Sequence, residues 1–138
     1  MIKLIIVDDD RCVRKILELL FEKEGFRVKG VSRAEAALEW LKNNRDCDLM
    51  ITDVEMPEMN GFELSREAKK INAGLPVLGM LGNGCSRSQA GKSFDHFIAK
   101  PFDVEGLLDA VNYLLNRFAE SKNGSAPSRS GEGEFHAV

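Results

Sequence analysis

The chain has 138 residues, 43% of them hydrophobic, which is enough for one domain around one core and too short for two. No apolar stretch reaches the ~18 residues of a membrane-spanning helix, and Met1 leads into a strand-like segment in place of a signal sequence, so we expect a cytoplasmic protein without membrane insertion. The net charge of -3, with both signs interspersed, leaves no basic stripe for DNA or RNA, and proteins are the expected partners.

The first predicted unit is a strand followed by a helix. A short apolar run, Lys3–Val7, ends in three aspartates, which is typical of a parallel strand buried on both faces. Apolar residues then recur at helical spacing and predict an amphipathic helix over residues 11 to 24, which Gly25 ends. The apolar positions of this helix are Val13, Ile16, Leu17, Leu20 and Phe21.

The second and third units repeat this pattern. Residues 26 to 31 are strand-like, and Ser32 is placed to cap a helix whose inner face is apolar. Residues 48 to 53 predict the third strand, and Asn60-Gly61 begins the next helix. The inward positions of these two helices are Ala34, Ala37, Leu38 and Leu41, and then Leu64, Ala68 and Ile71.

The sequence pattern of the last two units is uneven: their strands and the final helix are clear, and the fourth helix is not. Residues 76 to 81 and 95 to 99 predict the fourth and fifth strands, but residues 82 to 91 lack an apolar stripe, so the fourth helix is expected to be short or irregular. The final helix has a continuous apolar stripe and is expected to end near residue 119. We therefore expect a domain over residues 1–119 and a disordered tail or linker remnant over 120–138, which is poor in apolar residues.

Strands that alternate with helices predict right-handed β-α-β crossovers and an open parallel sheet covered on both faces. The predicted fold class is therefore α/β, a doubly wound (βα)5 domain. In such sheets, ligands bind outside the carboxyl ends of the strands. Asp8 and Asp9 follow the first strand, Asp53 ends the third, Leu81 ends the fourth, and Lys100 follows the fifth, so these five residues are expected to share one pocket.

Three carboxylates in one pocket repel one another and call for a hard divalent cation, for which Mg²⁺ fits best. A carboxylate such as Asp53 can attack phosphorus and form an acyl phosphate, while the cation and Lys100 neutralise charge on the phosphoryl oxygens. Asp10 fits better as a charge near the positive end of the first helix than as a ligand.

Four motifs resemble the receiver domain of two-component response regulators over roughly residues 2 to 118. They are residues 5–10, residues 48–53, Met56-Pro-x-Met-x-Gly61 and Lys100-Pro101-Phe102. The resemblance implies a flavodoxin-like, five-stranded sheet of order 2-1-3-4-5. It also implies a two-component phosphorelay in which a sensor histidine kinase or phosphotransfer protein is the donor and a downstream protein is the partner. A homodimer is compatible with it.

The resemblance assigns roles to the site residues. Asp53 would be the phosphoacceptor, Asp9 a direct Mg²⁺ ligand, Asp8 a ligand through metal-bound water, and Glu55 a ligand through its backbone carbonyl. Lys100 would contact the phosphate, and the peptide bond between Lys100 and the following proline would be cis. The chain would then be a signalling phosphoacceptor and not an enzyme in the usual sense.

The sequence departs from the family where the switch is expected. Receivers usually end the fourth strand with Thr or Ser, whereas this chain has Leu81 and offers no hydroxyl before Ser86. Phe97 stands where the family often has a Tyr, and a phenyl ring cannot donate a hydrogen bond. We expect the coupling between phosphorylation and structural response to be weakened or routed differently.

Three other functions stay open at this point. A degenerate receiver would dock partners without phosphorylation, as Leu81 suggests. A phosphohydrolase of the haloacid dehalogenase type would use Asp8 and Asp10 as its D-x-D pair, but a second acidic pair and a cap are missing. A flavin carrier shares the architecture, but the aspartates after the first strand would repel the flavin phosphate.

The cysteines and histidines do not indicate a site of their own. Cys12, Cys47 and Cys85 are far apart and form no C-x-x-C motif, which argues against structural zinc. We expect buried, reduced thiols that pack as small apolar side chains. His96 and His136 are isolated, so histidine catalysis is not expected.

Overall fold

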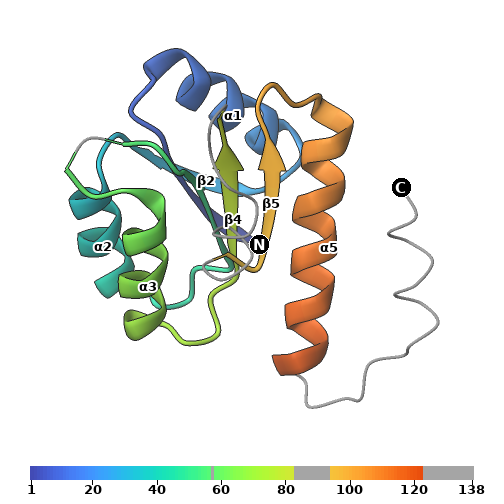
Figure 1. Ribbon diagram of the computed structural model, residues 1–138. Helices are drawn as coiled ribbons and strands as arrows, with labels where there is room; N and C mark the ends of the chain where they lie inside the picture. Colours follow the sequence, from blue (N-terminus) through green and yellow to red (C-terminus); the bar gives the residue numbers. More distant parts are fainter. Residues whose placement is uncertain (57, 83–93, 123–138) are drawn as a thin grey trace.

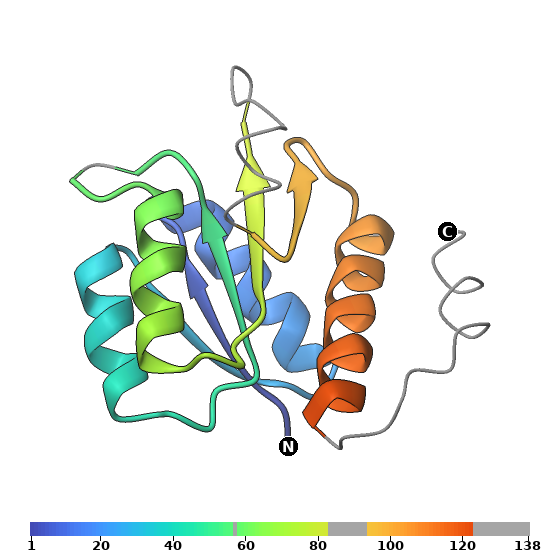
Figure 2. The ribbon, with the colours of Figure 1, turned by 60° about the horizontal axis from the view of Figure 1, so that its bottom comes forward.

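The computed structural model describes residues 1–56, 58–82 and 94–122, which form a parallel sheet between two pairs of helices (Figure 1). The sheet has five strands in the order β2-β1-β3-β4-β5, and all the arrows point toward the same edge (Figure 2). The strands are β1 (Lys3–Val7), β2 (Arg27–Val31), β3 (Leu49–Asp53), β4 (Val77–Leu81) and β5 (His96–Ala99). The predicted fold class and strand order are confirmed.

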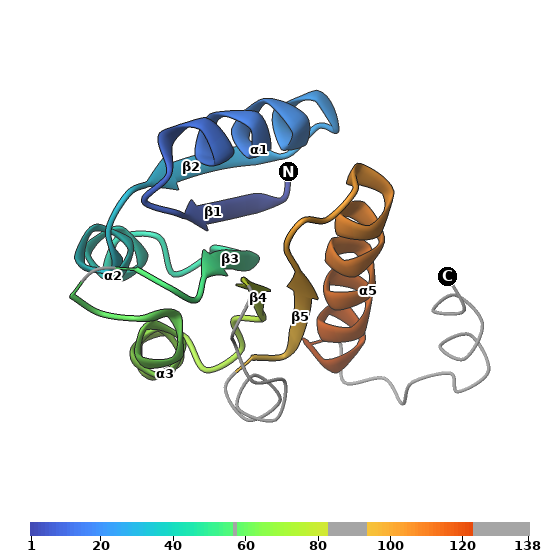
Figure 3. The ribbon, with the colours of Figure 1, turned by 45° about the horizontal axis from the view of Figure 1, so that its top comes forward.

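Of the helices in the described ranges, two lie on each face of the sheet (Figure 3). The helices are α1 (Arg11–Lys23), α2 (Ala34–Lys42), α3 (Gly61–Ile71) and α5 (Val104–Lys122). The expected short fourth helix falls on residues 83–93, which lie outside the described residues, as does the tail from residue 123. Helix α5 continues to Lys122, so residues 120–122 belong to the helix and not to the expected tail. Within the described ranges, no helix has the length and apolar character that crossing a membrane requires.

Each face of the sheet carries its own hydrophobic core, because side chains alternate between the faces along a strand. Leu4 and Ile6 of β1 pack on the side of α1 and α5, whereas Ile5 and Val7 pack on the side of α2 and α3. Full burial of one such side chain stabilises the fold by about 1.5–3 kcal/mol. The central strands β1, β3 and β4 are therefore nearly continuous apolar runs, as predicted.

The helix ends follow local side-chain chemistry. Asp10 caps α1, since its carboxylate accepts hydrogen bonds from the backbone N–H groups of the first turn. Gly25 ends the same helix with φ of 96°, a left-handed conformation that glycine adopts without steric cost. Asn60 forms a capping box with Glu63 at the start of α3. The predicted cap of α2 was wrong: the helix starts at Ala34, so its N-cap is Arg33 and not Ser32.

Helix α1 buries a narrower stripe than its sequence suggested. Leu17 and Phe21 are buried under the sheet, but Ile16 is 63% exposed. Position 16 lies at the margin of the stripe, because successive helical residues turn by about 100°. Cys12 is also exposed on this helix, which contradicts the expectation of a buried thiol.

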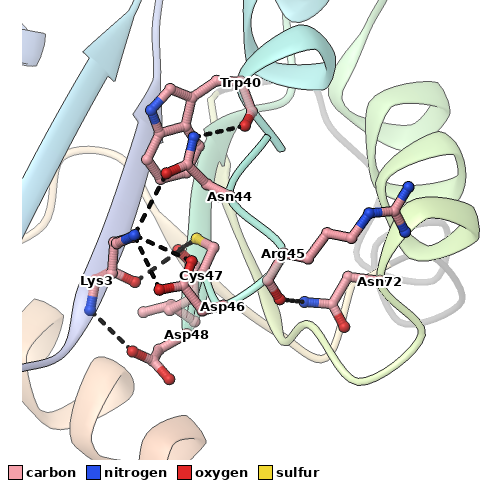
Figure 4. A network of polar contacts seen from close by, with 9 residues as sticks. Lys3, Trp40, Asn44, Arg45, Asp46, Cys47, Asp48 and Asn72 are labelled. Atoms are coloured by element: carbon pink, nitrogen blue, oxygen red, sulfur yellow. Dashed lines mark hydrogen bonds and ion pairs between the residues drawn. The ribbon is translucent and has the colours of Figure 1, made fainter. Parts of the chain in front are cut away.

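A polar network closes the end of the sheet where the strands begin (Figure 4). The ammonium group of Lys3 lies 3.0 Å from the Asp46 carboxylate and 3.3 Å from the side-chain oxygen of Asn44. The backbone N–H of Lys3 donates to Asp48 at 2.9 Å. The hydrogen bond from Lys3 lowers the pKa of Asp46. This network ties the first strand to the loop before β3, at the end of the strands opposite to Asp8 and Asp53.

Cysteine reactivity should separate two of the thiols. Cys47 is 1% exposed and its sulfur lies 3.5 Å from the carbonyl oxygen of Leu49. Burial raises the pKa of the Cys47 thiol to about 11, so very little reactive thiolate forms at neutral pH. Native protein treated with iodoacetamide at about pH 8 is expected to be alkylated at Cys12 and not at Cys47, as read by peptide mass spectrometry. Equal labelling of Cys12 and Cys47 in the native protein would contradict the burial of Cys47.

Candidate functional site

The first group of site residues follows β1. The strand is buried on both faces, so its end places Asp8 inside the protein with no exposed surface, whereas Asp9 is exposed. The side chain of Asp8 accepts a hydrogen bond from the backbone N–H of Asp10 at 2.9 Å, which tightens the turn before α1. Asp10 caps the helix, so the prediction that it acts at the helix end is confirmed.

Asp53 ends β3 next to this turn, and it is 7% exposed. One of its carboxylate oxygens accepts from the backbone N–H of Glu55 at 3.4 Å. Its backbone carbonyl accepts from the buried hydroxyl of Thr52 at 2.9 Å. Gly61 packs directly against the same carbonyl, because a Cβ added to this glycine would lie 2.6 Å from the Asp53 oxygen. The main chain of Asp53 is therefore held from two sides.

Lys100 reaches the acidic residues from the end of β5. Its ammonium nitrogen lies 3.4 Å from Asp8 Oδ2 and 3.5 Å from Asp53 Oδ2. The peptide bond between Lys100 and Pro101 is cis, as predicted. The backbone N–H of Lys100 donates to the carbonyl of Leu81 at 2.7 Å, which ties the lysine to the neighbouring strand. Beside it, an open cavity of about 430 Å³ is lined by Val13, Lys100, Pro101 and Phe102.

Three strand ends therefore bring together the residues that the sequence predicted. Carboxylate oxygens of Asp8, Asp9 and Asp53 all lie within 4.8 Å of one another. Hard oxygen donors of negative charge, two of them on buried residues, suit Mg²⁺ better than softer metals. Lys100 balances only part of this negative charge, so the residues present fit a divalent cation. Glu55 lies beside Asp53, and its side chain is exposed.

The electrostatics of Asp53 reflect its burial. Removal from water raises its pKa above the ordinary value of 3.8, the charge of Lys100 lowers it, and the nearby charge of Asp8 raises it again. The net direction is upward, so the charged carboxylate is less favoured in the folded, metal-free protein than it is in water. A cation that enters the site stabilises the charged form of this carboxylate.

Asp53→Asn should therefore stabilise the metal-free protein at pH 7. Because the folded-state pKa of Asp53 is raised, ionisation of this carboxyl opposes folding at neutral pH. The gain from a neutral amide should shrink as the pH falls through the raised pKa and vanish below the ordinary value of 3.8. Urea unfolding in a chelator, at several pH values, measures this. A variant that is less stable than the parent at pH 7 would contradict it.

Leu81 ends β4 as predicted, and its side chain is 3% exposed and packs in the core beneath α2 and α3. It pairs with Ala99 of β5, so the strand end is fully formed. Strand β4 therefore presents no hydroxyl to the site. Phe97 is partly buried against the same core. Ser86, the next hydroxyl along the chain, lies outside the described residues.

Sequence reasoning missed two contacts that shape the site. Arg14 of α1 donates to the backbone carbonyl of Asp8 at 2.9 Å, and Thr52 donates to that of Asp53. The sequence offered one indication of the Arg14 contact: this basic residue lies beside the inward stripe of α1, six positions after Asp8. Thr52 gave no signal, because a threonine in a strand usually reflects β propensity alone.

Comparison with known proteins gives a consistent picture. The sequence-family model described as "Response regulator receiver domain" matches residues 4–112 of this chain. Response regulator MprA of Mycobacterium sp. (strain KMS) is 31% identical over 130 residues, which are 92% of this chain and 56% of MprA. Response regulator SaeR of Staphylococcus aureus (strain USA300) is 30% identical over 124 residues, which are 85% of this chain and 52% of SaeR. The chain thus spans about half the length of these relatives.

Solved structures show the same fold. A response regulator receiver domain protein from Clostridium thermocellum superposes with a TM-score of 0.79 at 26% identity, over 85% of this chain and 96% of the other. The chemotaxis protein CheY4 of Vibrio cholerae gives a TM-score of 0.76 at 28% identity, over 83% and 99%. Sequence, topology and site agree: the chain belongs to the receiver domain family of two-component response regulators, a family of signalling domains.

Proposed function

We propose that the chain accepts a phosphoryl group on Asp53, beside a Mg²⁺ ion held by Asp8, Asp9, Asp53 and the backbone carbonyl of Glu55. One observation carries this proposal. The carboxylate of Asp53 is buried at a strand end, within contact of Lys100 and within 4.8 Å of the other two carboxylates. A nucleophile, a cation site and a lysine for the phosphate are what phosphoryl transfer requires.

The residues would act as follows. A carboxylate oxygen of Asp53 forms a bond to phosphorus while the bond between phosphorus and the donor breaks and its electron pair leaves with the donor. Lys100, which lies between Asp8 and Asp53, is placed to pair with an oxygen of the incoming phosphoryl group. The Mg²⁺ ion, when bound, would neutralise charge on the phosphoryl oxygens. The contacts to the Asp53 main chain fix the attacking carboxylate in place.

The direct test measures the mass of the intact protein after incubation with Mg²⁺ and a small acyl phosphate. The expected result is a gain of one phosphoryl group that Asp53→Ala removes. Asp46→Ala is the matched control, because this carboxylate belongs to the Lys3 network and not to the site, and the variant should still gain the group. A parent protein without mass gain would defeat the acceptor function, and so would an equal gain in Asp53→Ala.

A phosphorylation-independent receiver is the alternative function, and the leucine at position 81 is the feature of the sequence that raises it. The buried leucine offers no hydroxyl to a phosphoryl oxygen. One hydrogen bond to a charged group contributes about 1.5–3 kcal/mol, so its absence would weaken the structural response without blocking the chemistry. Amide spectra with and without Mg²⁺ and a phosphoryl mimic separate the two functions. Shifts that reach beyond the site favour a responding acceptor, and an unchanged spectrum favours the docking module.

The wider role belongs to the same proposal. A sensor histidine kinase or a phosphotransfer protein is the expected donor, and a downstream protein is the expected receiver of the signal. The chain would act in the cytoplasm as a phosphoacceptor and not as an enzyme with turnover on a separate substrate. Homodimerisation is compatible with this role, and direct nucleic-acid binding is not expected for this chain, given its charge of -3.

A further inference from the structure

Asp8 is held at every polar atom. Its backbone N–H donates to the carbonyl of Val31 at 3.2 Å. Its two carboxylate oxygens accept from the backbone N–H of Asp10 at 2.9 Å and from Lys100 at 3.4 Å. Its backbone carbonyl accepts from Arg14 at 2.9 Å. The first two bonds come from main chain and the third from the lysine of the site. Among the described residues, the Arg14 contact is thus the one side-chain bond to Asp8 that comes from outside the site.

This carbonyl needs a partner because of where it lies. The pairing of β1 with both of its neighbours extends as far as Val7, so Asp8 follows the last paired residue of the strand. A buried backbone carbonyl without a hydrogen bond is costly, and sheet pairing no longer supplies one here. The guanidinium group of Arg14 supplies a charge-assisted bond, which is stronger than a neutral one.

Gly30 makes room for the side chain of Arg14. A Cβ added at Gly30 of β2 would lie 3.2 Å from Cγ of Arg14, and it would overlap the carboxylate of Glu18. The half-buried stem of Arg14 thus passes over a position in β2 that carries no side chain. Helix α1 lies alongside β1 and β2 (Figure 3), so an arginine at position 14 extends toward the turn that follows β1.

We propose that Arg14 is a positioning residue of the acidic site. By holding the carbonyl of Asp8, it fixes the turn that sets the spacing of the Asp8 and Asp9 carboxylates, and so it favours cation binding. The inference rests on the proposed Mg²⁺ site. The charge of Arg14 has the opposite effect, because a guanidinium near the site repels a dication. Positioning and charge therefore predict opposite changes in Mg²⁺ affinity when Arg14 is replaced.

The test is a calorimetric Mg²⁺ titration of the full chain. Arg14→Met keeps the apolar stem and loses both the donor and the charge, and it is expected to weaken Mg²⁺ binding about tenfold, as loss of an outer contact to a ligand typically does. Arg14→Lys keeps a charged donor and should fall between Arg14→Met and the parent. Arg11→Met is the matched control, since it removes the same charge from an exposed position of the same helix, and it should not weaken binding.

The outcomes are distinct. Weaker binding in Arg14→Met with partial rescue in Arg14→Lys supports positioning. Unchanged or tighter binding in folded Arg14→Met overturns it, even if the variant is less stable, because a purely structural role would lower stability and leave affinity unaltered. If Arg14→Met does not fold, Mg²⁺ affinity is measured in Arg14→Gln, which is polar and shorter, and the same outcomes apply. A parent protein that does not bind Mg²⁺ would instead defeat the proposed function, and the inference with it.

Discussion

Asp9→Asn is expected to weaken Mg²⁺ binding by about two orders of magnitude and to slow phosphorylation of Asp53 accordingly, while the fold stays intact. Asp9 is exposed, so its replacement disturbs no core packing. Its carboxylate lies within 4.8 Å of the other two, and an amide keeps an oxygen ligand but loses the negative charge. A hundredfold loss of affinity corresponds to about 2.7 kcal/mol. A Mg²⁺ titration and the rate of mass gain with an acyl phosphate measure the two effects.

Asp10→Asn is the matched control for this prediction. The Asp10 side chain accepts from the backbone N–H groups of Cys12 and Val13 at 2.9 and 3.3 Å, and asparagine caps helices about as well as aspartate. This variant loses the same charge one residue away and is expected to bind Mg²⁺ nearly as the parent does. If both variants lost affinity equally, general charge and not ligation would explain the result.

Gly61→Ala is expected to lower the free energy of unfolding by about 2–3 kcal/mol. The added Cβ would lie 2.6 Å from the backbone oxygen of Asp53 and 2.9 Å from Cα of Val54. Both atoms belong to main chain that is itself held, since Gly61 donates to the Val54 carbonyl at 2.8 Å. The loop that carries Asp53 would have to move, so phosphorylation should slow as well. Urea unfolding and the mass assay measure the two effects.

Gly25→Ala provides the comparison. Nothing lies within 4 Å of a Cβ at this position, but φ is 96°, so alanine pays a conformational cost of about 1 kcal/mol without any overlap. We expect a smaller loss of stability than in Gly61→Ala and no loss of phosphorylation. A Gly61→Ala protein as stable as Gly25→Ala would show that the loop beside Asp53 yields easily, which would contradict the tight packing.

Leu81 bears on the proposed structural response and not on the proposed chemistry. The groups proposed for the chemistry, Asp53 and Lys100, lie in contact. Strand β4 does not supply the hydroxyl that is expected to report the phosphoryl group, because a buried leucine ends it. The backbone of Leu81 still accepts from Lys100, so the strand and the lysine remain coupled through main chain. A hydroxyl of β4 is therefore not available for a structural response.

Much of the fold followed from local pattern. The apolar runs of the strands and the spacing of inward residues in α1, α3 and α5 predicted the elements to within a few residues. The errors concern the first residue of a helix and the width of a buried helix face, which local pattern predicts less closely. Ser32 missed the cap of α2 because the helix begins after Arg33, and Ile16 and Cys12 are exposed because the buried stripe of α1 is narrow.

The sequence by itself determined which residues stand at the strand ends, because hydrophobic runs and the acids and lysine that follow them are local features. It thereby predicted that Asp8, Asp9, Asp53 and Lys100 would meet at one edge of the sheet, and the structure brings them together. Only the tertiary structure decided how their main chain is held. The contact of Arg14 with Asp8 joins a helix to a turn, and its geometry depends on packing that no local pattern records.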